Sequence, residues 1–318
     1  MPNARQAAPQ TQTRLAVIGA GSIGVRLAAG FLEHGARVAI HDPDTDRLEG
    51  CRREIASAMA DLGSRSNRAF DPENLRTDAA IAGAVSDADL VIECAPEDLA
   101  LKRGIFRDVG ASAPAGAILA SATSSIPASR IAAGLPCADR CLVAHPVNPP
   151  HIIRVIELVP APFTASATAQ RAREVFAEAG YHCVILGREV TGFAYNRLQG
   201  AVLREAYCLV RDGVLSASDI DLLVREALGF RWSVVGPFEA VDLNTRGGIE
   251  AHARKLGPAY ARMGAERGQD DPWTDELVAR VTAERRRDLP LEDWEERVAW
   301  RDRELAALAA WRRSRGGG

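Results

Sequence analysis

The fold of this chain is indicated most clearly by residues 15–24, which read Leu15-Ala16-Val17-Ile18-Gly19-Ala20-Gly21-Ser22-Ile23-Gly24. Its first four residues form an apolar run of the buried parallel-strand type, which leads directly into the pattern Gly-x-Gly-x-x-Gly. An amphipathic segment follows, and then a second apolar run over residues 37–41, which ends at Asp42. A strand, a glycine-rich turn, a helix and a second strand with an acid at its end are typical of a dinucleotide-binding unit.

Each glycine of this pattern has a mechanical role. Gly19 permits a tight turn, Gly21 lets the backbone approach a pyrophosphate, and Gly24 lets the helix pack closely on the strand. The pyrophosphate would rest on the helix N-terminus, where free N–H groups favour an anion. Asp42 would accept hydrogen bonds from the adenosine ribose and repel a 2′-phosphate, so we expect NAD rather than NADP. The alternative is an ordinary turn with incidental glycines. The predicted cofactor-binding residues of this unit are Gly19, Gly21, Ser22, Ile23, Gly24 and Asp42.

A second informative segment runs from Ala144 to Pro150 with the sequence AHPVNPP, and Glu157 follows twelve residues past its histidine. Residues 140–145 and 154–159 are predicted as strands joined by a proline-rich turn. In a hairpin centred near residue 151, His145 and Glu157 are direct cross-strand neighbours with Cβ atoms about 5 Å apart. A carboxylate on one imidazole nitrogen leaves the other free to accept a proton from an alcohol. The alternative is a strand-end histidine capped by a surface glutamate.

Strand and helix patterns alternate to about residue 187, and only helical periodicity follows. We therefore predict an α/β protein with a Rossmann-type doubly wound sheet at 13–187 and an all-helical C-terminal domain at 188–313. Flexible tails are expected at 1–12 and 314–318, and a loop at 63–75. The predicted helices of the second domain cover about 190–212, 217–228, 247–264, 273–286 and 291–313.

Several polar residues follow the ends of predicted strands. Ligands of doubly wound sheets bind at the carboxyl ends of strands, so these residues should meet at one edge. They are Gly19, Asp42, Glu97, Ser124 and His145.

The first helix of the second domain is expected to carry Phe193, Asn196, Gly200, Leu203 and Tyr207 on one apolar face. A buried asparagine amide there must find partners, either across the two domains or on a substrate or cofactor.

Composition limits the classes of function. The chain has 318 residues, of which 47% are hydrophobic and 25% charged, and this is typical of a globular protein with about two domains. A net charge of −3 gives no basic surface for nucleic acid, and no apolar run reaches the length of a membrane span. The six cysteines form no CxxC pair, so we expect reduced thiols in the cytoplasm and no metal site. The run Arg285-Arg286-Arg287 is expected on a solvated helix face.

Several motifs occur together along the chain: Gly19-x-Gly21-x-x-Gly24, Glu97, Thr123-Ser124-Ser125, His145–Pro150, Glu157-Leu158-Val159 and Gly192-Phe193-x-x-Asn196-Arg197-Leu198. Taken together, they resemble those of the L-3-hydroxyacyl-CoA dehydrogenase family over about residues 13–313. Within that family, the form His-Pro-Val-Asn-Pro-Pro and the segments Gly229–Trp232 and Gly236–Glu239 look most like its L-gulonate 3-dehydrogenase (lambda-crystallin) branch.

This resemblance implies roles for individual residues. His145 would be the general base and Glu157 its orienting partner, and Ser124 and Asn196 would form hydrogen bonds around the reacting oxygen. Family members bind NAD and dimerise through the helical domain, so a homodimer is expected. The cofactor contacts implied in addition to the glycine-rich unit are Glu97, Lys102, Ser124 and Asn148.

The expected reaction is NAD-dependent oxidation of the 3-hydroxyl of an L-gulonate-like 3-hydroxy acid. Arg231 is a candidate anchor for a free carboxylate, which a guanidinium can grip with two hydrogen bonds. A structural ion pair of Arg231 with an acid such as Glu239 is the alternative. An L-3-hydroxyacyl-CoA substrate stays open, because arginines within 44–75 could hold coenzyme A phosphates although the chain has only two lysines. A dinucleotide-binding protein without catalysis is the remaining alternative.

Overall fold

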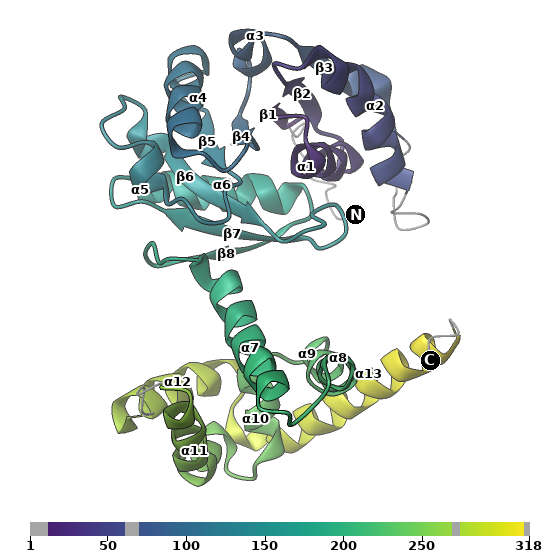
Figure 1. Cartoon of the computed structure of the whole chain (residues 1–318), viewed down its shortest axis with the longest axis vertical. Coiled ribbons are helices and arrows are strands. Elements are labelled where there is room, and N and C mark those ends of the chain that lie inside the picture. Colours follow the sequence, from purple (N-terminus) through teal and green to yellow (C-terminus); the bar gives the residue numbers. More distant parts are fainter. Residues whose placement is uncertain (1–11, 61–69, 269–273, 315–318) are drawn as a thin grey trace, which may run out of the picture. The chain divides into compact units, whose positions relative to one another are not determined.

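The computed structural model describes residues 12–60, 70–268 and 274–314 (Figure 1). The chain divides into two compact units, residues 1–202 and 203–318. The predicted tails lie outside the described residues except for Gln12, whose amide donates to the carbonyl of Gly35 at 2.6 Å, and Ser314.

Eight strands in the described part of the first unit form one sheet, in the order β3-β2-β1-β4-β5-β6-β7-β8. Neighbouring strands pair in parallel except β6 and β7, which are antiparallel. The predicted Rossmann-type doubly wound sheet is confirmed, and the predicted hairpin supplies its antiparallel pair. The strands are β1 (Arg14–Ile18), β2 (Arg37–His41), β3 (Leu75–Asp78), β4 (Leu90–Glu93), β5 (Ile118–Ser121), β6 (Cys141–Pro146), β7 (Val155–Pro160) and β8 (His182–Ile185).

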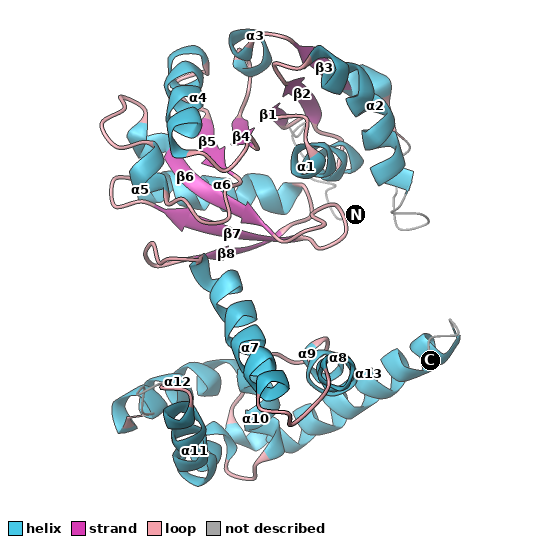
Figure 2. Ribbon diagram, in the orientation of Figure 1, coloured by secondary structure: helices cyan, strands magenta, loops and turns pink. Residues whose placement is uncertain are grey.

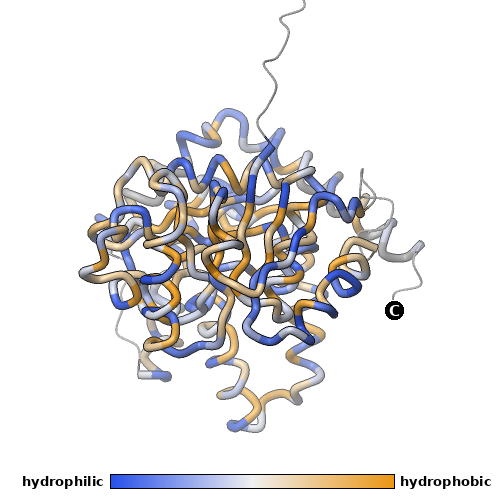
Figure 3. Tube along the Cα trace, turned by 90° about the horizontal axis from the view of Figure 1, so that it is seen from above, coloured by the Kyte–Doolittle hydropathy of each residue, from blue (hydrophilic) through white to orange (hydrophobic). Residues whose placement is uncertain are grey.

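Helices cover both faces of this sheet (Figure 2). Side chains alternate along each strand, so Val17 and Ile92 join a core with helices α1, α2 and α6, whereas Ile18 and Val91 face α3, α4 and α5. Hydrophobic and hydrophilic stretches accordingly alternate along the chain (Figure 3). The helices are α1 (Ser22–Glu33), α2 (Thr45–Ala60), α3 (Ile81–Val85), α4 (Leu99–Ser112), α5 (Ala128–Ile131) and α6 (Ser166–Glu178).

Strand β3 and helix α3 were not predicted. The sequence indicated a loop up to residue 75 and no strand before residue 88, and residues 61–69 of that loop lie outside the described ranges. β3 pairs with β2 only, and Leu75 is its one buried residue. A four-residue edge strand with three partly exposed residues carries no clear alternation, which explains why the pattern missed it.

The second unit consists of helices in its described residues. A small core forms around Val235, Ala240, Leu243 and Leu289, with Trp294 and Trp300 packed against it. No helix of the described ranges is long and apolar enough to cross a membrane. The helices that follow β8 are α7 (Phe193–Arg211), α8 (Ala217–Leu223), α9 (Gly229–Trp232), α10 (Pro237–Asn244), α11 (Gly248–Glu266), α12 (Asp275–Asp288) and α13 (Trp294–Ser314).

Helices α9 and α10 were not predicted, and two further features of this unit differ from the predictions. Phe193 is buried on α7, but Leu203 and Tyr207 are exposed, so the expected apolar face is not buried within this chain. Arg286, expected in solvent, forms an ion pair with the fully buried Asp242. The local sequence around either residue does not predict this ion pair.

Candidate active site

The glycine-rich turn between β1 and α1 has the geometry that the sequence predicts. Gly19 has φ = 114°, and a Cβ there would lie 2.9 Å from the carbonyl oxygen of Cys94 at the end of β4. A Cβ on Gly24 would lie 2.1 Å from the carbonyl oxygen of Gly19. Both positions therefore require glycine, the first for its left-handed backbone and the second for the close approach of α1. Ser22 and Ile23 open the helix, so its free N–H groups face the turn.

Asp42 connects the end of β2 to this turn. Its Oδ2 accepts a hydrogen bond from the backbone N–H of Ala20 at 2.8 Å, and its Oδ1 accepts from the N–H of Asp44 at 3.0 Å. Each carboxylate oxygen retains a further lone pair, which suits a ribose hydroxyl. The turn and the acid therefore fit the adenosine half of a dinucleotide.

His145 and Glu157 meet across the β6–β7 hairpin. They are direct partners in the antiparallel register, as the spacing predicted. Imidazole Nδ1 lies 2.7 Å from Glu157 Oε2, and the two residues are 5% and 3% exposed. With the carboxylate accepting from Nδ1–H, the Nε2 atom keeps its lone pair and can accept a proton.

The second carboxylate oxygen of Glu157 holds the start of α7 by hydrogen bonds. Oε1 accepts hydrogen bonds from the backbone N–H groups of Ala194 at 2.9 Å and Tyr195 at 2.8 Å. Phe193, just before them, is fully buried with φ = 51°, and its ring centroid lies 5.5 Å from that of His145. A left-handed backbone at a bulky residue is costly, so the surrounding contacts must hold it.

Asn196 and Ser124 are also brought together. The Asn196 side-chain amide donates to the backbone carbonyl of Ser124 at 3.1 Å, while the Ser124 side chain is exposed. Asn196 is half-buried and not buried as predicted, and its amide bonds a backbone carbonyl within the first unit. This bond fixes the loop after β5 to the first turn of α7 within the first unit.

Glu97 organises the same loop from the other side. Its Oε1 accepts from Thr123 Oγ1 at 2.5 Å and from Ser125 Oγ at 2.7 Å. Burial alone would raise the pKa of Glu97, but these hydrogen bonds and the nearby charge of Lys102 outweigh it and hold the pKa below its ordinary value. Glu97 is therefore a carboxylate that positions the segment around Ser124.

Lys102 lies behind this loop in an ion pair with Glu93. Lys102 Nζ is 2.8 Å from Glu93 Oε1 and 3.6 Å from Glu97 Oε2, and the Lys102 and Glu93 side chains are each 1% exposed. Ser121 donates to the other oxygen of Glu93 at 2.6 Å. Glu93 was not singled out in the sequence, although an acid ending the apolar strand Leu90–Glu93 is a signal that could have found it.

Tyr195 is another residue that the sequence reasoning missed. Its ring centroid lies 6.3 Å from that of His145 with the planes inclined at 57°. Its position beside Asn196 on the first turn of α7 gave no local signal, because the contact depends on the fold of the hairpin.

Two predicted site residues remain, one in each unit. Asn148 is exposed in the turn after β6 and makes no side-chain hydrogen bond within the described residues. Arg231 belongs to the second unit, on α9, directly after a π-helical turn at Val224–Leu228. Its Nε is buried with no hydrogen-bond partner in the described structure. Glu239 Oε1 instead accepts from Arg297 Nε at 2.7 Å.

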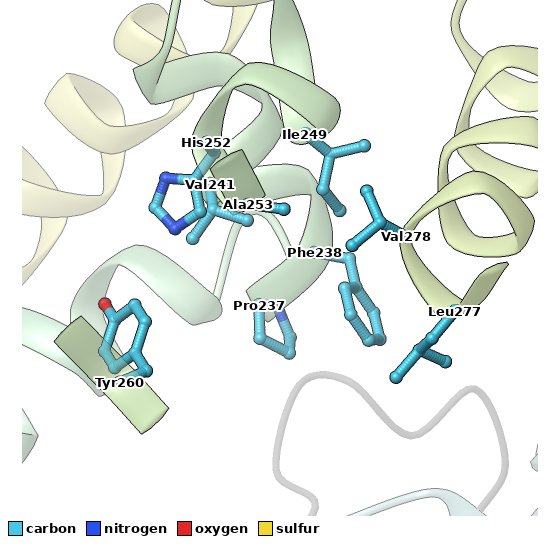
Figure 4. Close-up of a pocket in the computed structure, with 9 residues that line it drawn as sticks. All are labelled: Pro237, Phe238, Val241, Ile249, His252, Ala253, Tyr260, Leu277 and Val278. Atoms are coloured by element: carbon cyan, nitrogen blue, oxygen red, sulfur yellow. The ribbon is translucent and has the colours of Figure 1, made fainter. Parts of the chain in front are cut away.

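A separate cavity of about 370 Å³ lies in the second unit (Figure 4). Most of its lining is apolar, including Phe238 from α10 and Leu277 and Val278 from α12. His252 and Tyr260 from α11 are the polar residues of its lining. Within the described part of the chain, no group of three or more His, Cys, Asp or Glu side chains is placed to hold a metal ion.

Comparison with known proteins decides the family. Residues 14–190 match the family described as 3-hydroxyacyl-CoA dehydrogenase, NAD binding domain, and residues 192–288 match the 3-hydroxyacyl-CoA dehydrogenase C-terminal domain. The chain belongs to the 3-hydroxyacyl-CoA dehydrogenase family. The resemblance inferred from the motifs is thereby confirmed. As a member of this family, the protein is an NAD-dependent dehydrogenase that acts on CH–OH groups.

Individual relatives span nearly the same length. A lambda-crystallin homolog from Homo sapiens is 34% identical, with 83% of this chain and 94% of the relative covered. An L-carnitine dehydrogenase from Streptomyces griseus is 36% identical, with 84% and 78% covered. A crystal structure of 5-formyl-3-hydroxy-2-methylpyridine 4-carboxylic acid 5-dehydrogenase, an NAD+-dependent dismutase, has a TM-score of 0.71 at 29% identity and covers 93% of this chain and 99% of its own.

Proposed function

We propose that this dehydrogenase oxidises the 3-hydroxyl of a free, L-gulonate-like 3-hydroxy acid to the 3-keto acid. His145 acts as the general base and Glu157 orients it. The observation that carries the proposal is the buried 2.7 Å hydrogen bond between His145 Nδ1 and Glu157 Oε2, which directs the basic Nε2 away from the carboxylate.

The proton step follows from these two side chains. The substrate hydroxyl donates to His145 Nε2, which takes the proton as the C–H bond of the carbinol breaks. The resulting imidazolium is stabilised by the Glu157 carboxylate, which is fixed by the N–H groups of Ala194 and Tyr195 and needs no rearrangement. NAD, when bound, supplies the acceptor for the carbinol hydride.

Ser124 and Asn196 complete the proposed site. The exposed Ser124 hydroxyl donates to the reacting oxygen and polarises the carbonyl in the reverse direction. Asn196 holds the Ser124 backbone through its 3.1 Å hydrogen bond. Its side-chain oxygen remains an acceptor for substrate or cofactor. Glu97 and Asn148 are proposed to contact the cofactor from the loop after β4 and the turn after β6, and Lys102, buried behind Glu97, is proposed to act on the cofactor through that carboxylate.

The choice of a free acid rests on Arg231. The buried Nε without a partner leaves the guanidinium with unused hydrogen-bonding capacity, which a carboxylate would fill. We propose that Arg231 binds the substrate carboxylate. In Arg231→Met, KM for a free hydroxy acid should rise about tenfold or more, with little change for a CoA thioester. An unchanged KM for the free acid would remove this role.

The second candidate substrate is an L-3-hydroxyacyl-CoA. The family description favours it, and exposed arginines on α2, such as Arg52, could contact coenzyme A phosphates. L-Carnitine is a further candidate because a relative is named as its dehydrogenase.

A substrate panel tests the proposal directly. NADH formation is measured with L-gulonate, L-carnitine, 3-hydroxybutyrate and 3-hydroxybutyryl-CoA at saturating NAD+. We expect the highest kcat/KM with L-gulonate, and lower values with L-carnitine, 3-hydroxybutyrate and 3-hydroxybutyryl-CoA. A preference for the thioester by tenfold or more would replace the free-acid proposal with the acyl-CoA one.

We also propose that the protein is a homodimer in a reducing compartment such as the cytoplasm. Apolar side chains of α7 are exposed at helical spacing, namely Leu203, Tyr207 and Val210. A stripe of this kind is what a second copy of the chain would cover. The six cysteines, all within the described ranges, are free thiols, which suits a reducing environment.

A further inference from the structure

Arg47 is a cation placed beside the glycine-rich turn. It lies in the first turn of α2, and its side chain is 59% exposed. Its Nη1 atom lies 3.9 Å from the point that a Cβ on Gly21 would occupy. Gly21 is the residue before α1 and the position at which the backbone comes nearest to a dinucleotide pyrophosphate.

A continuous set of contacts holds Arg47 there. Asp44 Oδ2 lies 3.6 Å from Arg47 Nε, and Asp44 Oδ1 accepts from the N–H of Asp46 at 3.0 Å at the start of α2. The N–H of Asp44 donates to Asp42, which in turn accepts from Ala20 in the glycine-rich turn. The first turn of α2 is therefore tied to the turn that receives the cofactor.

The Arg47 guanidinium has two different neighbours, and this leaves part of it available to a ligand. Nε faces the Asp44 carboxylate, while Nη1 faces Gly21. Because Gly21 has no side chain, a phosphate oxygen can reach both its backbone and the guanidinium. An arginine keeps its charge at every relevant pH and can form two parallel hydrogen bonds to a phosphate.

We propose that Arg47 is a further anchor for the pyrophosphate of NAD, adding a side-chain cation to the N–H groups of α1. The role concerns the established cofactor and is independent of which substrate is oxidised. Two neighbouring carboxylates, Asp42 and Asp44, oppose the binding of a 2′-phosphate at the same place. The guanidinium therefore serves the phosphates shared by NAD and NADP.

Calorimetric binding to the intact protein tests this role without turnover. Arg47→Gln should raise Kd for NAD+ and for ADP-ribose about tenfold at low salt, with a smaller ratio at high salt, because a hydrogen-bonded charge on the surface is screened. Arg47→Lys should recover part of the affinity. Arg107→Gln, which removes the same charge from an exposed position on α4, is the matched control and should leave both Kd values within about twofold.

Three results would overturn the proposal. Equal Kd values for Arg47→Gln and Arg107→Gln would show that the cation does not contact the cofactor. An equal loss of affinity for adenosine, which has no phosphate, would assign Arg47 to the adenine ring instead. A loss confined to NADP+, with NAD+ unchanged, would assign it to a 2′-phosphate. Thermal unfolding of each variant shows that the folded protein is being compared.

Discussion

Both oxygens of Glu157 are in use, and this one side chain joins the imidazole on β6 to the first turn of α7. Oε2 accepts from His145, and Oε1 accepts from two backbone N–H groups. Three N–H groups donate to the Glu157 carboxylate. A glutamine in the same place would point its side-chain N–H₂ group at one of these donors, and an N–H₂ group cannot accept a hydrogen bond. The geometry of the proposed base therefore depends on a carboxylate at this position.

Glu157→Gln tests this dependence on a carboxylate. We expect kcat to fall by about 10²-fold, because the imidazole loses both its fixed tautomer and the partner of its positive charge. The affinity for NAD+, measured by calorimetry, should stay the same, since Glu157 is not among the residues expected to contact the cofactor. An unchanged kcat would show that the pair is structural only.

Lys102 gives a second prediction for a single residue. Its ammonium is buried against Glu93, and Lys102→Met leaves that carboxylate uncompensated. The free energy of unfolding in urea should fall by roughly 3–5 kcal/mol. Lys102→Met combined with Glu93→Gln should recover much of the loss, because the neutral amide can still bond Ser121. A double variant no more stable than Lys102→Met would contradict this account.

At the scale of elements, close packing of α1 on β1 explains the last glycine of the motif. A Cβ on Gly24 would meet the Gly19 carbonyl, whereas a Cβ on Gly104 in α4 would meet nothing within 4 Å. Gly24→Ala should therefore destabilise the protein by about 1–3 kcal/mol and weaken NAD+ binding. Gly104→Ala should stabilise it by up to about 1 kcal/mol through the unfolded state. Denaturant unfolding of the pair distinguishes local crowding from a general effect of alanine.

The elements also show how far the sequence could be interpreted. The glycine-rich unit and the hairpin were predictable because local spacing dictates their geometry, and the His145–Glu157 register followed from counting residues alone. Edge strand β3 and the short helix α10 were missed because neither has enough residues for a periodic pattern. The contacts of Glu93 and Tyr195 were missed because they join segments that only the folded sheet brings together.

The whole chain divides its tasks between the two units. The proposed catalytic residues all lie in the first unit, near the ends of its strands. The helical unit has apolar residues that are exposed to solvent. Tyr207 is 76% exposed, and Leu203 lies one helical turn before it on α7. The apolar face of α7 that was predicted to be buried is therefore exposed to solvent in a single chain.

Mass measurement by light scattering tests the dimer. The wild-type protein should have twice the mass of one chain at micromolar concentration. Leu203→Glu combined with Tyr207→Glu should give monomers, because two charges would be buried in the interface. Arg204→Glu on the same helix is a control for added charge alone. A monomeric wild-type protein would contradict the proposal.

We propose that His145, held by Glu157, removes the proton of a 3-hydroxyl. This role is tested by comparing the steady-state rate of NADH formation by the wild-type protein and His145→Ala at saturating NAD+, with the best substrate of the panel. We expect kcat to fall by about 10²–10⁴-fold with NAD+ affinity unchanged. A variant that turns over at a rate close to that of the wild type would contradict it.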